Sequence, residues 1–305
     1  MDVAVLGAGP LGRGVAQVCV LAGHDVSLQD AEANVVMDGI DVVERRLGDL
    51  EAADDLSMEA HHDALHRLDG TTGLDAAVAE AEVVVETALT DADEIQGVFA
   101  EVEDLTDRDT LVATGRPAVA VTAAAAGLRH PDRAVGLLFR DPLEAPLVEV
   151  VAAEQTTEET ADRAVAFVEG IDRHPILVRD TPGVTTTRLA LAQEVEAMRL
   201  VTDGVASVPS VDEALVLGFD APVGPLERAD RAGLDNRLAT LEYLAESLGS
   251  RFEPPAVLED LVAAGRTGAA AGEGFYVWEN SEPQESALPE PDIPHREAGP
   301  DDPVR

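Results

Sequence analysis

The segment that most limits the possible folds of this chain is VAVLGAGPLGRGV at residues 3–15, where a glycine-rich loop separates a short apolar run from a helical pattern. Residues 7–12 of the loop read G-x-G-x-x-G. Between a strand and a helix, Gly7 permits a tight turn, Gly9 lets a pyrophosphate approach the backbone, and Gly12 lets the helix pack closely on the strand. The segment therefore predicts the first unit of a doubly wound α/β fold that binds a dinucleotide.

The residues around the loop indicate which dinucleotide is expected. At the start of the helix, where the dipole favours an anion, Pro10 has no N–H to donate, which leaves the amides of Leu11 and Gly12. Asp30 ends the next apolar run about 20 residues later, where a carboxylate accepts hydrogen bonds from ribose hydroxyls. No arginine follows it to neutralise a 2′-phosphate, so the sequence favours NAD over NADP. The alternative is a glycine-rich turn that holds no nucleotide.

Apolar runs with β-branched residues alternate with helical stretches over the first 180 residues. We expect strands at 3–7, 25–30, 82–88, 110–114, 134–139, 147–151 and 175–180. This alternation predicts a Rossmann-type, doubly wound and mostly parallel sheet. After the turn at 180–183 the strand pattern stops and helical spacing continues to residue 275. The predicted domains are 1–181, which binds NAD, 182–278, a small all-helical domain, and 279–305, an acidic, proline-rich and disordered tail.

Acidic residues dominate the charge of the chain. Its 305 residues carry a formal net charge of −39, and all 21 basic residues are arginine. Because the carboxylates are spread between apolar positions, they are typical of a soluble protein that works in high salt, where screening is strong. We therefore expect a halophilic source. No basic patch would neutralise phosphates, which argues against a nucleic-acid partner.

The sequence does not support a membrane, secreted, disulfide-bonded or metal-binding protein. No apolar run approaches the roughly 20 residues of a membrane helix, and the first residues lack a signal-peptide pattern, so we expect a cytoplasmic protein without a membrane partner. Cys19 is the single cysteine, which rules out an internal disulfide. His62 and His66 could share a helix face, but a metal site needs a third ligand and no convincing one is near. We predict a solvated helix face there, and no metal site.

Several segments, in the same order, resemble the L-3-hydroxyacyl-CoA dehydrogenase family. They are the glycine loop, EVVVETA at 82–88, the DTPG turn followed by Arg188 and Leu189, EAMRLVTDGVASVPSVDEALVLGFDAPVGPLERADRAGLD at 196–235, and GRTGAAAGEGFYVW at 265–278. The resemblance covers residues 1–278. It implies oxidation of a 3-hydroxyacyl-CoA by NAD, with the substrate held between two domains, and a homodimer formed through the helical domain. It also implies cofactor contacts from Glu86 and Thr114, at the ends of neighbouring strands.

The same resemblance reveals three substitutions at positions that carry the chemistry. In the family, a histidine in a G-x-HFFNP strand removes the hydroxyl proton, a glutamate in the next LVEV strand orients it, and a serine and an asparagine position the substrate oxygen. The strand aligns with residues 136–142 and places Leu138 at the histidine, while Pro117 replaces the serine and Thr187 the asparagine. Glu149 alone matches. A leucine cannot accept a proton, and loss of a general base costs roughly 10²–10⁴-fold in rate.

New polar residues near this position leave two functions open. Arg116 and Arg140 could clamp a carboxylate or a phosphate, and Asp141 could serve as a base. The alternative is that ion pairs, Arg140 with Asp141 or Arg116 with Glu149, fill the vacated site. The chain is accordingly either an NAD-dependent dehydrogenase with an altered substrate or an unusual base, or an inactive NAD-binding paralogue that acts as a regulatory or partner subunit.

Overall fold

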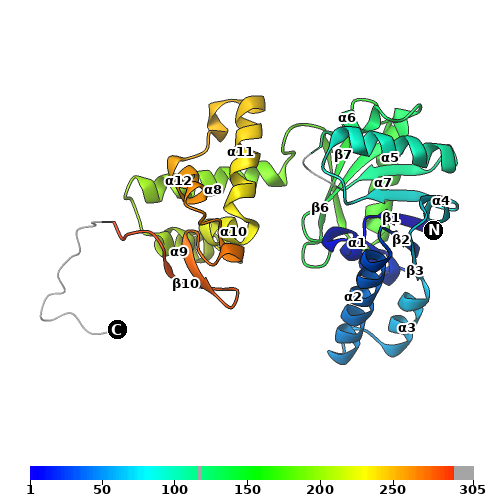
Figure 1. Ribbon diagram of the computed structural model, residues 1–305, viewed down its shortest axis with the longest axis horizontal. Helices are drawn as coiled ribbons and strands as arrows, with labels where there is room; N and C mark the ends of the chain where they lie inside the picture. The colour runs from blue at the N-terminus through cyan, green and yellow to red at the C-terminus, as the bar shows by residue number, and fades with distance from the viewer. Residues whose placement is uncertain (116–118, 292–305) are drawn as a thin grey trace, which may run out of the picture. The chain divides into compact units, whose positions relative to one another are not determined.

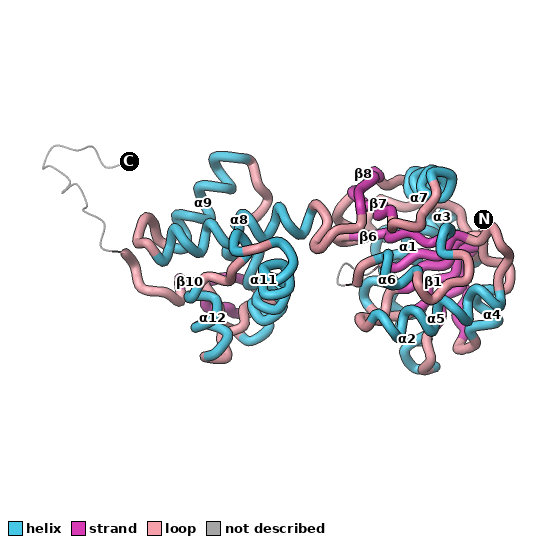
Figure 2. Tube along the Cα trace, turned by 90° about the horizontal axis from the view of Figure 1, so that it is seen from above, coloured by secondary structure: helices cyan, strands magenta, loops and turns pink. Residues whose placement is uncertain are grey.

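The computed structural model describes residues 1–115 and 119–291 of the chain. These residues form two compact units, the first from Met1 to Val184 and the second from Thr185 onward (Figure 1). The first unit contains a large sheet covered by helices, and the second is helical apart from a terminal hairpin (Figure 2). The predicted α/β sheet followed by a helical region is therefore confirmed.

One sheet of eight strands organises the first unit, in the order β3-β2-β1-β4-β5-β6-β7-β8. The strands are β1 (Asp2–Leu6), β2 (Asp25–Gln29), β3 (Leu68–Thr71), β4 (Val83–Glu86), β5 (Leu111–Thr114), β6 (Ala134–Phe139), β7 (Leu147–Ala152) and β8 (His174–Arg179). The six strands from β3 to β6 run parallel, whereas β7 pairs antiparallel with β6 and parallel with β8. The order of the strands reverses between β1 and β4, and doubly wound sheets bind their ligands at the carboxyl ends of the strands beside such a switch.

Helices cover both faces of this sheet because its strands are apolar on both sides. Val3 and Val5 belong to one core cluster, whereas Ala4 and Leu6, which point to the opposite face, belong to another. The first cluster includes residues of α1 (Pro10–Leu21), α2 (Ala33–Ala52), α3 (Met58–His66) and α7 (Glu158–Gly170), and the second includes residues of α4 (Leu74–Val78), α5 (Ala92–Leu105) and α6 (Val121–Ala125). Burial on both faces explains why the strands read as continuous apolar runs in the sequence.

Two buried aspartates fasten the second unit together. Its elements are α8 (Thr186–Thr202), α9 (Val208–Phe219), α10 (Pro225–Ala232), α11 (Leu234–Leu248), α12 (Ala256–Ala263), β9 (Tyr276–Glu279) and β10 (Glu282–Ser286). Asp212 accepts hydrogen bonds from two amides in the first turn of α10 and from the Tyr276 hydroxyl. Asp230 accepts from two amides at the beginning of the hairpin and from the Trp278 indole. Burial raises the pKa of both carboxyl groups.

Two elements differ from the sequence-based predictions. β3 has the sequence LDGT and lies between the strands predicted at 25–30 and 82–88, where the sequence predicts none. It lacks the β-branched run that predicts a strand, and it is a strand because it pairs with β2. β10 lies in the tail that was expected to be disordered from residue 279. It pairs with β9 through Asn280 and Ser281, whose φ angles of 51° and 66° suit a tight hairpin. The expectation of disorder is therefore wrong for residues up to Ser286.

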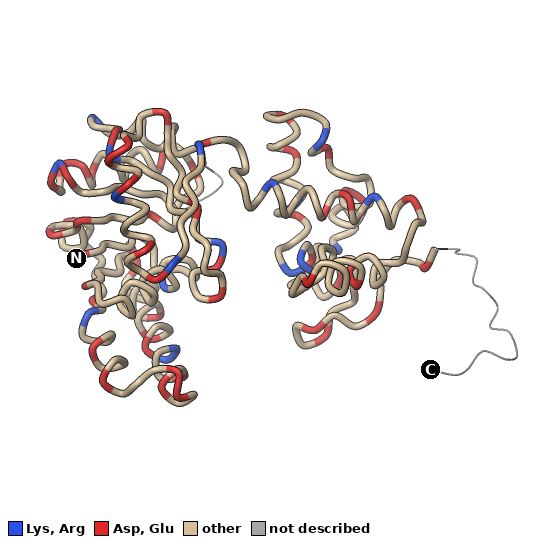
Figure 3. Tube along the Cα trace, turned by 180° about the vertical axis from the view of Figure 1, so that it is seen from behind, with Lys and Arg blue, Asp and Glu red and all other residues tan. Residues whose placement is uncertain are grey.

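Acidic side chains are spread over both units. In Figure 3 acidic residues recur along the backbone trace of both units, with few basic residues between them. This distribution matches the sequence, in which carboxylates are not gathered in one segment. Within residues 1–115 and 119–291, no helix is both long enough and apolar enough to cross a membrane.

Candidate active site

The glycine loop leaves β1 at the carboxyl edge of the sheet and enters α1 with Gly9 as the N-cap and Pro10 as the first helical residue. Gly7 has φ +101°, which favours glycine, and its N–H donates to the carbonyl oxygen of Gln29 at 2.7 Å. A Cβ on Gly12 would overlap the Gly7 carbonyl oxygen, whereas a Cβ on Gly9 would meet no heavy atom within 4 Å. The loop is therefore closed against the protein at Gly7 and Gly12 and open at Gly9, as pyrophosphate binding requires.

Thr87 secures this loop from the neighbouring strand. It directly follows β4, and its side chain is buried. Its Oγ1 donates to the carbonyl oxygens of Leu6 and Gly7 at 2.9 and 3.0 Å. No sequence pattern predicts this role for Thr87, because a single threonine after a strand forms no motif.

Asp30 fixes the loop as well as bordering the space beside it. Its Oδ2 accepts a hydrogen bond from the Ala8 amide at 3.0 Å, and its Oδ1 accepts one from the Glu32 amide at 3.3 Å. Together with Gly7 and Glu86 it lines a pocket of about 320 Å³. Because each carboxylate oxygen can accept more than one hydrogen bond, Asp30 can hold the loop and still accept ribose hydroxyls.

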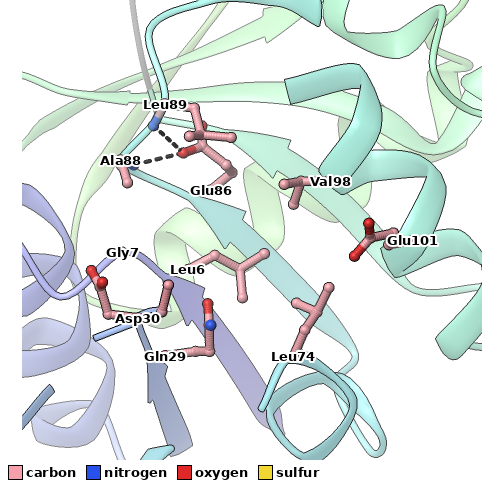
Figure 4. A pocket seen from close by; sticks show the side chains of 11 residues that line it. Leu6, Gly7, Gln29, Asp30, Leu74, Glu86, Ala88, Leu89, Val98 and Glu101 are labelled. Carbon is pink, nitrogen blue, oxygen red and sulfur yellow. Dashed lines mark hydrogen bonds between the residues drawn. The ribbon is translucent and has the colours of Figure 1, made fainter. Parts of the chain in front are cut away.

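The pocket beside Asp30 has the composition of an adenosine site. Its other lining residues come from β1, β2, α4, α5 and the segments after β2 and β4: Leu6, Gln29, Ala31, Leu74, Ala88, Leu89, Val98 and Glu101 (Figure 4). Leu6, Leu74 and Val98 point into the same space, which suits the faces of a base. The Asp30 carboxylate at one side of the pocket suits a ribose. The contributions of α4 and α5 follow no motif and were not predicted.

Glu86 and Thr114 end neighbouring strands, where they are register partners and completely buried. Glu86 Oε1 accepts hydrogen bonds from the amides of Ala88 and Leu89, both at 2.6 Å. Thr114 Oγ1 donates to Glu86 Oε2 at 3.5 Å. These bonds fix the ends of β4 and β5 beside the glycine loop, and Glu86 also contributes to the wall of the adenosine-type pocket.

A second pocket, of about 400 Å³, lies against the first turns of α1. It is lined by Pro10, Leu11, Gly14, Arg46 and residues 140–144. It thus brings Leu11 of the cofactor loop together with Arg140 and Asp141, which follow β6. Arg46 comes from α2, and nothing in the sequence around it indicated that it would reach this position.

Asp141 caps a turn in this pocket. Its Oδ1 accepts hydrogen bonds from the amides of Leu143 and Glu144 at 3.0 and 3.2 Å. No ion pair joins Arg140 to Asp141, both of which are in the described part of the chain, so the predicted pair is wrong. The carboxylate instead accepts hydrogen bonds from the two turn amides. Arg116 and Pro117 lie outside the described residues.

Leu138 and Glu149 are directly opposite each other in the pairing of β6 with β7, so their side chains point to the same face. Leu138 is 7% exposed and Glu149 is 2% exposed. Leu138 belongs to an apolar cluster whose other members are Val121, Val151, Ala153 and Val184. An apolar side chain, packed among others, therefore occupies the position beside the buried carboxylate. Thr187 lies in the first turn of α8, in the second unit.

The described residues fit NAD and contain no cluster for a metal. Gly9 leaves room for a pyrophosphate, the amides of Leu11 and Gly12 lie in the first turn of α1, and Asp30 borders the apolar pocket. Within residues 1–115 and 119–291, no group of three or more His, Cys, Asp or Glu side chains could hold a metal ion.

Comparison with known proteins assigns both units to one family. The NAD-binding domain of 3-hydroxyacyl-CoA dehydrogenase matches residues 2–181, and the C-terminal domain of the same enzyme matches residues 183–278. The chain is 32% identical over 278 residues to a probable 3-hydroxybutyryl-CoA dehydrogenase of Deinococcus radiodurans, over 90% of this chain and 99% of that protein. It is 31% identical to a 3-hydroxybutyryl-CoA dehydrogenase of Bradyrhizobium diazoefficiens, over 92% of this chain and 96% of the relative.

A solved structure agrees with these sequence matches. The (S)-3-hydroxybutyryl-CoA dehydrogenase of Ralstonia eutropha superimposes with a TM-score of 0.88 and 29% identity, over 92% of this chain and 99% of that chain. Sequence and fold therefore match over both units and over nearly the whole length of the relatives. The chain belongs to the 3-hydroxyacyl-CoA dehydrogenase family.

Proposed function

We propose that this chain is an NAD-dependent oxidoreductase that oxidises a 3-hydroxyacyl-CoA or a related 3-hydroxy acid. The observation that carries the proposal is the intact cofactor loop, closed at Gly7 and Gly12, open at Gly9, and held by Asp30 beside an apolar pocket. The relatives described above are dehydrogenases of 3-hydroxybutyryl-CoA, which supports a substrate of that class. When bound, NAD accepts the hydride that leaves the carbinol carbon.

The chain's own residues bind and orient the cofactor in this proposal. The amides of Leu11 and Gly12 donate to the pyrophosphate at the positive end of the α1 dipole. Asp30 accepts from the ribose hydroxyls, and no arginine next to it would accommodate a 2′-phosphate. Glu86 and Thr114 keep the ends of β4 and β5 fixed, through the hydrogen bonds described above.

The proton released with the hydride needs a different acceptor from the one the family uses. Leu138 cannot accept it, and Glu149 is buried beside Leu138. Asp141 is exposed in the 400 Å³ pocket, and its turn cap uses only Oδ1, so we assign Asp141 Oδ2 as a weak substitute base. Arg140, in the same pocket, supplies a positive charge for an anionic group of the substrate, and Arg116 is part of the same proposal.

A second function is favoured by the packing of Leu138. Leu138 packs in an apolar cluster with Val121 and Val151. Such packing is expected of a protein that has the fold of the family but does not catalyse proton transfer. In that case the chain is an NAD-binding paralogue that acts as a regulatory or partner subunit. Both functions require NAD binding, so turnover separates them.

The test is an assay of the purified chain in molar KCl, first with acetoacetyl-CoA and NADH, then with a panel of 3-hydroxy acids and their CoA esters. We expect slow, NADH-dependent reduction of acetoacetyl-CoA, or turnover of one member of the panel. If no member of the panel is turned over while NADH still binds, the enzymatic proposal is overturned and the second function is favoured. An assay without added KCl tests the expected requirement for high salt, which the spread of carboxylates supports.

The proposal includes a cytoplasmic homodimer formed through the second unit. α9 carries Leu217 and Phe219, each 78% exposed, and large apolar side chains that are exposed together favour a protein interface. Light scattering is expected to give twice the mass of one chain, and Phe219→Asp is expected to lower it toward one chain. A native protein with the mass of one chain would contradict the dimer.

A further inference from the structure

A small polar pocket lies at the end of the sheet opposite the cofactor loop. The loop follows the last residue of β1, whereas this pocket is lined by Asp2 and Asp25, the first residues of β1 and β2. Its volume is about 180 Å³, and Asp69 and Glu80 add two more carboxylates to its wall. Arg67 also lines the pocket, but it is paired with Asp25 at 3.1 Å. The pocket is therefore a place of negative potential that favours a cation.

Two histidines of α3 meet at this pocket. His62 and His66 are one helical turn apart, and their Nε2 atoms lie 3.0 Å from each other. The ring centroids are 4.3 Å apart and the rings lie nearly perpendicular, in an edge-to-face arrangement. His66 also lines the pocket, which places the pair at the acidic wall.

We propose that His62 and His66 form a bidentate site for a divalent transition-metal ion of the Cu²⁺, Zn²⁺ or Ni²⁺ class. Two nitrogens bound to one ion at about 2.0–2.1 Å lie roughly 2.9 Å apart at a right angle and roughly 3.4 Å apart at the tetrahedral angle. The observed 3.0 Å falls inside this range, so the two nitrogens need not move apart for the ion to bind; the rings need only turn until both lone pairs face it. Imidazole nitrogen suits these ions, and water completes the coordination.

The metal competes with a hydrogen bond between the two rings. Without metal, one Nε2–H donates to the other Nε2, which requires different tautomers for the two histidines. With metal, both rings carry their proton on Nδ1 and offer an Nε2 lone pair. The sequence-based expectation of a solvated helix face rested on the lack of a third ligand. The two nitrogens are 3.0 Å apart and an acidic pocket lies beside them, which favours a chelate formed by two nitrogens.

The site is separate from the cofactor. It lies at the amino ends of the strands. Both of its ligands come from one helix, so they can chelate a metal ion only while that helix is folded. We therefore expect the metal to raise the melting temperature of the chain through preferential binding to the folded state. NAD affinity is expected to remain unchanged.

The experiment is a calorimetric titration of tag-free protein with CuCl₂ and with ZnCl₂ in molar KCl and excess Mg²⁺. Magnesium prefers oxygen ligands and occupies the carboxylates, so that it leaves only nitrogen sites to be measured. We expect one ion per chain, with Cu²⁺ bound more tightly than Zn²⁺, in line with the general order of divalent metal affinities. Electron paramagnetic resonance of the Cu²⁺ form is expected to show coupling to nitrogen.

Three variants decide the assignment. His62→Gln and His66→Gln are each expected to weaken Cu²⁺ binding by at least about tenfold, since even the loss of an outer-shell partner costs that much. His174→Gln is the matched control, because His174 is another exposed histidine, at the start of β8, far from the pair in the sequence. NADH titration of each variant checks that it is folded. Native protein that binds no Cu²⁺, or binding that survives in both pair variants, would overturn the proposal.

Discussion

The end of β1 and the end of β6 lie at the same edge of one sheet, but they differ in how many of the groups expected of a dehydrogenase are present. After β1, every group expected of a cofactor loop is in place, and Thr87 and Asp30 brace it from two neighbouring strands. At the end of β6, Leu138 packs among apolar side chains and lies directly opposite Glu149 of β7. The cofactor loop depends on backbone shape, whereas proton transfer depends on one side chain. Binding and turnover can therefore be lost separately.

The largest expected effect concerns the cofactor loop. Gly9→Asp is expected to abolish measurable NADH binding, because the new carboxylate would occupy and repel the pyrophosphate position. The chain should still fold, since a Cβ on Gly9 meets no heavy atom within 4 Å. Fluorescence titration with NADH measures the effect. Gly48→Asp is the matched control, because Gly48 also has open space around it and lies in α2, outside the glycine loop. Unchanged affinity in Gly9→Asp would mean that the cofactor binds elsewhere.

The next largest effect concerns the strand end. Leu138→His is expected to raise the rate of acetoacetyl-CoA reduction by roughly 10²-fold, the lower end of what a general base contributes, because Asp141 already substitutes in part. The new ring would lie beside Glu149, its register partner. Steady-state rates at saturating NADH measure the change.

Two controls accompany this substitution. Leu138→Asn introduces a polar side chain without a base and is expected to show no gain. Adding Glu149→Gln to Leu138→His removes the carboxylate that would orient the ring, and most of the gain is expected to disappear. A gain of the same size in Leu138→Asn would point to relief of packing rather than to proton transfer.

A smaller effect is expected at Asp30. Asp30→Ala removes an acceptor that holds the Ala8 amide and faces the ribose. A hydrogen bond to a charged group contributes about 1.5–3 kcal/mol, so NADH affinity is expected to fall roughly 10–100-fold. The same titration measures it. Asp30→Asn, which keeps a carbonyl acceptor, is expected to lose less. Equal losses of NADH affinity in the two variants would show that the negative charge of Asp30, and not its hydrogen-bond acceptor, supports binding.

The smallest effect is expected at Asp141. Asp141→Asn keeps an oxygen that can cap the turn at Leu143 and Glu144 but removes the base. Turnover is expected to fall about tenfold, less than the roughly 10²–10⁴-fold of a well-positioned base, because Asp141 is exposed and one of its carboxylate oxygens is used by the turn cap. Thermal unfolding should be nearly unchanged. A turnover equal to that of the native chain would remove Asp141 from the proposed chemistry.

The sequence predicts the sheet and the cofactor loop well because both have local signatures. Strands that are buried on both faces read as apolar runs, and the spacing of Gly7, Gly9 and Gly12 has a specific structural cause. β3 and β10 were not anticipated, because LDGT and EPQES owe their pairing to a neighbouring strand and not to their own composition.

The site was less predictable, because most of its walls come from distant segments. Thr87, which follows β4, bonds to the loop, while Val98 of α5 and Arg46 of α2 line the two pockets beside it, and no spacing in the sequence connects these residues. The alignment of Leu138 with the family's histidine remains a hypothesis that rests on the family resemblance. The packing of this leucine in an apolar cluster, opposite a buried glutamate, could be seen only in the structure.

The most direct test of the difference between the two strand ends is one stopped-flow measurement in molar KCl, in which the chain, in excess over NADH, is mixed with NADH and acetoacetyl-CoA. NADH fluorescence reports binding first and oxidation afterwards in the same trace. We predict rapid binding, followed by oxidation roughly 10²-fold slower than in Leu138→His. A trace without a binding phase, or native oxidation as fast as that of Leu138→His, would contradict the account.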